Sequence, residues 1–217
     1  NNLQEKDIDF LLAGDLLNQI ITANYAARTI GIPFFGLFGA CSTMVEALIL
    51  GSVLIDGGFA TNVIGATASH YGTAERQFRM PVEHGNQRPM TAQWTVTGSG
   101  ATLLSKNPSE IKVTYATVGK VVDMGISDAN SMVVAMAPAA ADTIINHFKD
   151  TGRQPDCYDL IVTGDLGKVG KEIAEDLIKK EGYDIGKIYD DCGVLVFDLE
   201  KQDVHSGGSG CACCATV

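Results

Sequence analysis

The chain has 217 residues, of which 46% are hydrophobic and 19% charged, and its formal net charge at pH 7 is −10. This composition is typical of a folded protein with one large domain or two small ones, and it excludes a disordered chain. The negative charge argues against nucleic-acid binding and against simple electrostatic attachment to anionic lipid. No stretch has the pattern of a signal peptide and no apolar run reaches about 18 residues, so we expect no transmembrane helix.

Six cysteines are present, three of them isolated and three in the cluster Cys211, Cys213 and Cys214. The cluster is a poor zinc signature, because no second pair of ligands stands at the required spacing. The sequence does not resemble a small secreted disulfide scaffold. We therefore expect free thiols in a reducing compartment, with no metal site and no cofactor.

The first part of the chain reads as alternating strands and helices. Strands are predicted at 8–13, 33–38 and 60–68, and helices at 16–29 and 42–56. The run 8–13 is nearly continuously apolar, which is typical of a parallel strand buried on both faces. A polar segment at 71–90 is long enough to indicate a lid or a partner-binding surface. Its Arg76, Arg79 and Arg88 could meet a carboxylate ligand, or they could be solvated loop charges.

The second part continues the same alternation. We predict a strand at 92–104 interrupted by Gly98–Gly100, strands at 111–118, 158–163 and 194–199, and a helix at 169–181. A further helix should begin at Pro138 after a loop, because proline is favoured in the first helical turn and disfavoured inside a helix. Alternating strands and helices indicate an α/β protein with mainly parallel sheets.

An internal duplication links the two parts. Residues 8–16 resemble residues 158–166, with aspartate, glycine, aspartate and leucine recurring in register. Each copy leads to a junction rich in glycine and cysteine, at 38–42 and at 209–213. The match is short and could be chance, but the order of elements favours two incomplete halves, 1–105 and 106–217. Such halves would bring Cys41 and the loop 205–210 toward one pocket, at the strand ends where α/β proteins bind ligands.

Cys41 lies at a predicted junction between a strand and a helix. Unpaired N–H groups and the helix dipole at such a position favour the thiolate, as in a nucleophile or a small anion site. The alternative is a small buried residue in a tight turn, because free cysteine is among the most buried residue types.

Four motifs together resemble a known family: Gly36–Leu48, Thr91–Ala101, Met136–Ile144 and Gly207–Cys213. They are similar to the thiolase-like superfamily and, within it, to the stage V sporulation protein AD family of spore-forming bacteria. The resemblance implies a thiolase-like α/β fold, with two similar βαβ halves, mainly parallel sheets and layered helices. We expect this chain to be a fragment, because a complete member should carry an additional N-terminal strand and helix and a C-terminal helix and strand.

The resemblance also implies a function. A protein of this family is expected to be a soluble component of a spore membrane complex that binds dipicolinic acid for its uptake into the developing spore, using a degenerate thiolase-like pocket. The implied location is intracellular, in the forespore or spore and peripheral to the inner spore membrane. Implied partners are dipicolinic acid and other proteins of the channel complex, with a homodimer by analogy and no nucleic acid. Dipicolinate is a small planar dianion, which helix N-termini and glycine N–H groups would suit.

The departures from condensing enzymes bear on catalysis. Such enzymes support their cysteine with two further polar groups. One of these positions carries Thr163 in place of an imidazole or amide. The other loop, 204–210, keeps His205 but is one residue shorter than the superfamily pattern and lacks its proline. The alternative function is an active acyltransferase, with Cys41 as the acyl-carrying nucleophile and His205 as its base.

The candidate ligand-binding residues follow from these positions: Cys41, Ser42, His70, Thr163, Asp165, Gly207 and Gly208. Each has a structural alternative. His70 and His205 could be ordinary loop histidines, and Asp165, like its counterpart Asp15, could be a turn or helix-cap residue. The glycines could serve backbone shape alone.

Overall fold

The computed structural model describes residues 3–82 and 85–217, which form two compact units. Unit 1 lies within residues 1–78, 95–116 and 210–216, and unit 2 within 79–94, 117–209 and 217. These units do not coincide with the halves 1–105 and 106–217, because the late segment 210–216 packs into unit 1. The duplication itself stays a prediction.

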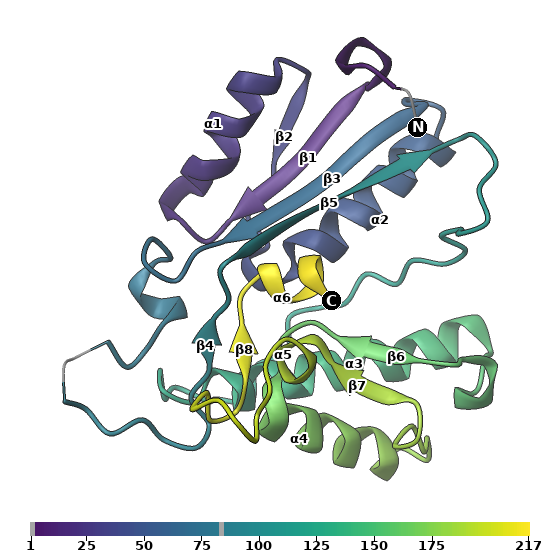
Figure 1. Ribbon diagram of the computed structural model, residues 1–217. Coiled ribbons are helices and arrows are strands. Elements are labelled where there is room, and N and C mark those ends of the chain that lie inside the picture. Colours follow the sequence, from purple (N-terminus) through teal and green to yellow (C-terminus); the bar gives the residue numbers. More distant parts are fainter. Residues whose placement is uncertain (1–2, 83–84) are drawn as a thin grey trace. The chain divides into compact units, whose positions relative to one another are not determined.

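Unit 1 is built on a four-stranded sheet in the order β2-β1-β3-β5 (Figure 1). Its strands are β1 (Phe10–Asp15), β2 (Phe34–Gly36), β3 (Asn62–Ser69) and β5 (Gly98–Ser105). β1 pairs in parallel with β2 and with β3, whereas β5 runs antiparallel to β3. The α/β architecture with mainly parallel pairing is confirmed.

Two helices pack on opposite faces of this sheet, α1 (Ile21–Ile30) and α2 (Thr43–Asp56). The alternation of side chains along β1 sets this arrangement, since successive residues of a strand point to opposite faces. Leu11 and Ala13 pack with the buried alanines of α1, whereas Leu12 packs with Ala47 of α2. The helix predicted at 16–29 begins only at Ile21, after the 3₁₀ turn η2 (Asn18–Ile20).

The strand predicted at 92–104 is interrupted at residues 96–97 and not at Gly98–Gly100, because these three residues begin the continuous strand β5. A separate short strand, β4 (Trp94–Thr95), precedes it. The glycines instead make room for helix α6 (Ala212–Thr216): a Cβ atom on Gly100 would lie 2.3 Å from the Ala215 carbonyl oxygen. Absence of a side chain therefore allows the helix to lie close against the strand.

The strand predicted at 111–118 is also wrong, because these residues form neither helix nor strand. Its apolar side chains face solvent, with Ile111 89% and Val118 79% exposed. Alternation of apolar residues favours a strand only when a neighbouring strand accepts the backbone hydrogen bonds. Among the described residues, no strand pairs with this segment.

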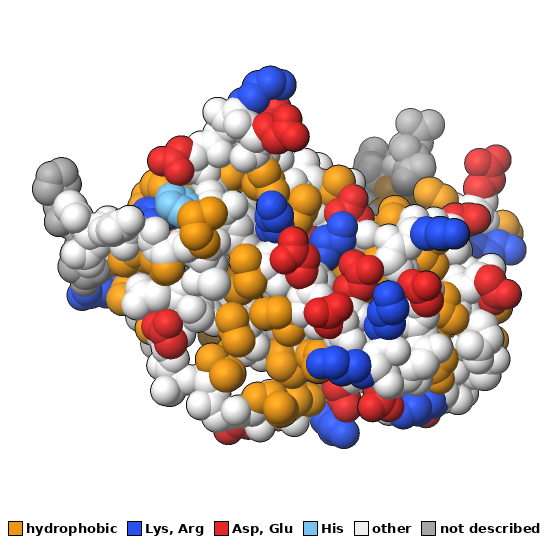
Figure 2. Space-filling model, turned by 90° about the horizontal axis from the view of Figure 1, so that it is seen from below, with side chains coloured by type: hydrophobic (Ala, Val, Ile, Leu, Met, Phe, Trp, Pro, Cys, Tyr) orange, Lys and Arg blue, Asp and Glu red, His pale blue; other side chains and the backbone are white. Residues whose placement is uncertain are grey.

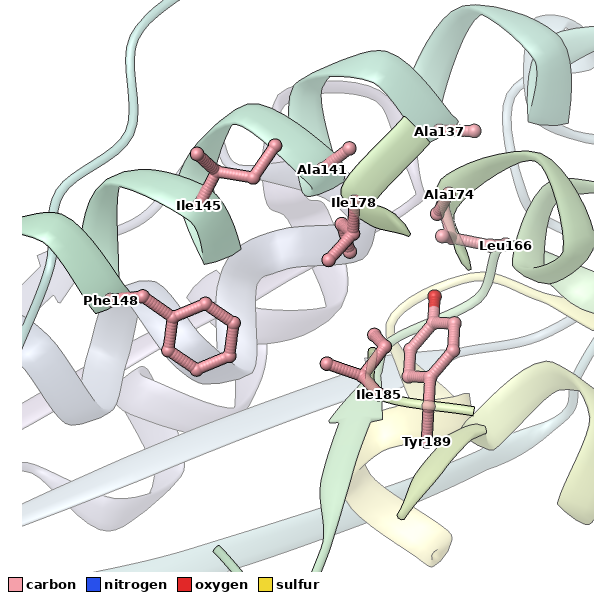
Figure 3. Packing of buried hydrophobic residues seen from close by; sticks show 9 residues of the cluster. All are labelled: Ala137, Ala141, Ile145, Phe148, Leu166, Ala174, Ile178, Ile185 and Tyr189. Atoms are coloured by element: carbon pink, nitrogen blue, oxygen red, sulfur yellow. The ribbon is translucent and has the colours of Figure 1, made fainter. Parts of the chain in front are cut away.

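Unit 2 contains the long helices α3 (Met132–Thr151) and α4 (Gly167–Lys180) and the parallel strands β6 (Ile161–Thr163) and β7 (Tyr189–Asp191). β6, α4 and β7 form a βαβ unit, as β1, α1 and β2 do in unit 1. Its core is shown in Figure 3 and consists of buried side chains from both helices and from the segments that flank them: Ala137, Ala141, Ile145, Phe148, Leu166, Ala174, Ile178, Ile185 and Tyr189.

Two predictions in unit 2 need correction. Helix α3 begins at Met132 and passes through Pro138, whereas a helix start at Pro138 was expected. The proline removes one backbone hydrogen bond, but burial of Val133 before it and Ala137 beside it favours the continuous helix. The strand predicted at 194–199 is absent, because α5 (Cys192–Leu195) includes its first two residues and the rest form no helix or strand.

The remaining elements are short. They are η1 (Glu5–Asp7), η3 (Ala40–Ser42), η4 (Arg76–Phe78), η5 (Pro155–Cys157) and β8 (Gly208–Ser209). On the face shown in Figure 2, acidic and basic side chains lie interspersed beside a group of hydrophobic ones. None of the described helices has the length and apolar character needed to cross a membrane.

Candidate functional site

Cys41 lies in the 3₁₀ turn η3, immediately before helix α2. The turn is held by local hydrogen bonds: the backbone N–H and the Oγ of Ser42 both donate to the Gly39 carbonyl, at 3.0 and 2.8 Å. Thr43 Oγ1 donates to the carbonyl of Ala40, a non-glycine residue with φ of 48°. Cys41 is half-buried. The local geometry therefore places its thiol at the N-terminal end of a 14-residue helix, as predicted.

Helix α6 connects the Cys41 turn to the end of β3. Cys214 Sγ lies 4.0 Å from the Cys41 carbonyl oxygen. Cys211 Sγ donates to the Ala68 carbonyl at 2.9 Å, and Ser69 Oγ accepts from the N–H of the residue after Cys211 at 3.1 Å. Burial raises the pKa of the Cys211 thiol, which keeps it protonated. Cys211 is therefore a packing residue, whereas Cys41 is partly accessible.

His70 follows β3 directly and is exposed. Its Nδ1 accepts from the Gly72 N–H at 3.0 Å, and its carbonyl accepts from the N–H groups of Thr73 and Ala74. Among the described residues, all of its hydrogen-bond partners lie in this turn. The structure thus gives His70 a turn-forming role and does not test a ligand-binding one.

In unit 2, Thr163 ends β6 and is buried. Its Oγ1 donates to Asp191 Oδ2 at 2.7 Å and lies 3.0 Å from the Tyr189 hydroxyl. The Thr163 hydroxyl is thus engaged inside the protein.

Asp191 was not identified from the sequence, yet it organises this part of unit 2. Besides the Thr163 hydroxyl, its carboxylate accepts the N–H groups of Leu166 and Gly167, at 2.9 and 2.8 Å. The side chain is fully buried, and this burial raises the pKa of the carboxyl. Asp191 therefore fixes the loop that begins α4. No signal in the sequence marks this role, because a single aspartate has no distinctive spacing.

Gln93 is a second residue that sequence reasoning missed. Its Nε2 donates to the carbonyl oxygens of Asp165 and Gly208, both at 2.7 Å. Because only 7% of the residue is exposed, the amide forms a buried link between the loop after β6 and the loop before α6. Gln93 thereby brings together backbone groups of two predicted ligand-binding residues.

The loop containing His205 is fixed by backbone hydrogen bonds. Ser206 N–H donates to the Ala92 carbonyl at 3.0 Å, and Trp94 N–H donates to the Gly207 carbonyl at 2.9 Å. The Gly207 N–H itself donates to the Val204 carbonyl at 2.9 Å. This N–H is consequently occupied and is not presented to a ligand.

His205 has a left-handed backbone, with φ of 51°. Its Nδ1 atom is buried and lies 3.6 Å from a carboxylate oxygen of Asp203, which is an ion pair only when the imidazole is protonated. The histidine is therefore largely buried, with 18% of its side chain exposed, and is not an ordinary solvated loop residue.

The predicted site residues fall into two sets. Unit 1 holds Cys41, Ser42 and His70, and unit 2 holds Thr163, Asp165, His205, Gly207 and Gly208. The proposed pairing of Cys41 with His205 stays a prediction. Across the described ranges 3–82 and 85–217, no group of three or more His, Cys, Asp or Glu side chains is placed to hold a metal ion.

Comparison with known proteins identifies the family. The profile of stage V sporulation protein AD (SpoVAD) matches residues 1–217. The chain is 58% identical over 217 residues to stage V sporulation protein AD of Bacillus subtilis (strain 168), covering 100% of this chain and 64% of that protein. It thus spans slightly less than two thirds of the length of this relative.

Solved structures support the fold. 3-Oxoacyl-[acyl-carrier-protein] synthase III of Aquifex aeolicus VF5 superposes with a TM-score of 0.64 at 14% identity, over 99% of this chain and 68% of that one. The corresponding synthase of Pseudomonas aeruginosa PAO1 gives a TM-score of 0.62 at 15% identity, over 97% and 66%. At these identities the likeness shows a thiolase-like fold alone. The family profile that matches the whole chain and the relative that is 58% identical to it show that the chain belongs to the stage V sporulation protein AD family.

Proposed function

We propose that this chain is part of a sporulation protein that binds dipicolinic acid for its uptake into the developing spore. The protein would act as a component of a spore membrane complex, located in the forespore or spore and peripheral to the inner membrane. Family membership supports the assignment to sporulation. The ligand of the protein and its partners are what we propose.

One observation favours binding over acyl transfer. At the position of a catalytic imidazole or amide, Thr163 donates its hydroxyl to the buried carboxylate of Asp191. A hydroxyl committed to this bond supports the loop and is not poised to hold a substrate oxyanion, because oxyanion donors must be free to face the reacting oxygen. Cys41 remains at its helix terminus, where it would contribute to a ligand pocket.

The competing function is acyl transfer, with Cys41 as nucleophile and His205 as base. It keeps some support, since the largely buried His205 belongs to a fixed loop. Acyl transfer would require covalent attachment of an acyl group to Cys41 Sγ, with release of the thiol that carried it.

Calorimetric titration of the full-length protein with dipicolinate, and separately with acetyl-CoA, tests the proposal. We expect dipicolinate binding that is weakened by Cys41→Ala, and no acyl adduct on Cys41 by mass spectrometry after incubation with acetyl-CoA. Cys157→Ala is the matched control, because that cysteine is exposed and lies outside both sets of site residues. Absence of dipicolinate binding, together with an acyl adduct on Cys41, would overturn the proposal.

A further inference from the structure

Two candidate donors for a dicarboxylate ligand in the unit 2 loops are uncharged and are already hydrogen-bonded within the protein. The Gly207 N–H is bonded to Val204, and the Thr163 hydroxyl is bonded to Asp191. Burial of a carboxylate is costly unless a cation or several N–H donors compensate it. A positively charged side chain should therefore lie near these loops.

Arg88 meets this requirement. Its guanidinium carbon lies 3.9 Å from the centre of the Trp94 ring, a close stacking contact. Trp94 in turn donates its backbone N–H to the Gly207 carbonyl at 2.9 Å. The three residues belong to unit 2, and the Trp94 backbone joins the segment that holds Arg88 to the glycine loop.

The guanidinium also has an unused donor. Arg88 Nη1 is buried from solvent and has no hydrogen-bond acceptor within the described part of the chain. Burying such a donor without a partner is costly, and native structures rarely leave one unsatisfied. The chain carries 26 acidic residues against 16 basic ones, yet no described carboxylate pairs with this arginine.

Stacking on a ring occupies the face of a guanidinium and leaves its in-plane N–H groups able to donate. These N–H groups form a fork that matches the two oxygens of a carboxylate. A planar aromatic carboxylate could in addition approach the tryptophan side of the pair. The arrangement is thus suited to a flat, anionic ring.

We propose that Arg88, held on Trp94, binds a carboxylate group of a planar aromatic dicarboxylate beside the Gly207–Gly208 loop. This inference rests on the proposed function and adds to it a residue that supplies the positive charge. Its guanidinium donates to the ligand carboxylate, and Trp94 keeps the guanidinium in place.

The test is titration of the full-length protein with dipicolinate, comparing the wild type with Arg88→Gln. We expect the dissociation constant to rise about 10- to 100-fold, which corresponds to loss of one charge-assisted hydrogen-bonded pair. Arg88→Lys keeps the charge but loses the fork, so an intermediate loss is expected. Pyridine, which has the ring without the carboxylates, should bind no better to the wild type than to either variant.

Arg153→Gln is the matched control, because Arg153 also lies over an aromatic ring, at 5.7 Å from that of Tyr158, in the same unit. It should bind dipicolinate as the wild type does. Urea unfolding followed by Trp94 fluorescence shows whether each variant is folded, and a misfolded Arg88→Gln leaves Arg88→Lys to decide. If the wild type binds dipicolinate and the folded Arg88 variants bind it with the same affinity, this inference is overturned and the proposed function stands. Absence of dipicolinate binding by the wild type overturns both.

Discussion

Replacement of Asp191 by alanine should destabilise unit 2 strongly. The carboxylate is fully buried and accepts hydrogen bonds from the Thr163 hydroxyl and from the N–H groups of Leu166 and Gly167, at 2.7, 2.9 and 2.8 Å. Alanine leaves the two N–H groups without an acceptor, whereas the Thr163 hydroxyl keeps the Tyr189 hydroxyl, 3.0 Å away, as a partner. At about 1–2 kcal/mol for each buried unsatisfied donor, the free energy of unfolding should fall by roughly 2–4 kcal/mol.

Equilibrium unfolding in urea at pH 7 measures this loss. Fluorescence of Trp94, the single tryptophan, reports on the segment bonded to Gly207, and circular dichroism reports on the whole chain. Asp191→Asn keeps one oxygen and should lose less than Asp191→Ala. The control is Asp159→Ala, which removes an exposed aspartate of the same unit. A loss below about 1 kcal/mol for Asp191→Ala would refute the reasoning, because buried donors must then find other acceptors.

Three further predictions concern other parts of the chain. Gly100→Val should lower the free energy of unfolding, measured in urea, by about 2 kcal/mol or more, because the valine side chain would collide with the Ala215 backbone. A variant as stable as the wild type would contradict the close approach of α6. Asp9 accepts hydrogen bonds from N–H groups at the start of β3, and these bonds lower its pKa. The stabilisation that Asp9 provides is therefore present above its unfolded-state pKa of about 3.9, and it is lost as the pH falls through the lower pKa of the folded state. Asp9→Asn should therefore flatten the acid side of the stability profile, and an unchanged profile would count against it. Alkylation followed by mass spectrometry should modify exposed Cys157 well before buried Cys211, whose pKa is raised; equal rates would show that Cys211 is accessible.

Elements whose hydrophobic pattern matches their final packing could be predicted from the sequence. β1, β3 and α2 were placed to within about two residues, because continuous apolar runs are typical of strands covered on both faces and a helical repeat marks a helix that packs on a sheet. The position of Cys41 before α2 followed from the same pattern.

The errors arose where tertiary contacts override local preference. Gly98–Gly100 are poor strand residues, yet α6 needs their lack of side chains in order to approach β5. Pro138 is a poor helix residue, yet the apolar face of α3 is continuous across it. Residues 111–118 have the composition of a strand but no partner strand among the described residues. Such contacts join distant segments and leave no local signal.

The same limit applies to the candidate site. Thr163 and Gly207 could be selected by their positions in the motifs. Asp191 and Gln93, which hold the loops around them, could not, because a single aspartate or glutamine has no distinctive spacing. Their roles depend on hydrogen bonds between residues that lie 24 to 115 positions apart in the sequence.

The placement of α6 in unit 1 has a consequence for synthesis on the ribosome. The sheet of unit 1 is complete once Ser105 has emerged, but the helix that covers Gly98 and Gly100 is made more than 100 residues later. At about 5–20 residues per second, that part of the sheet stays uncovered for roughly 5–20 seconds. During this interval the nascent chain exposes a small-residue surface on β5 that a chaperone or another nascent chain could occupy before residues 212–216 are made.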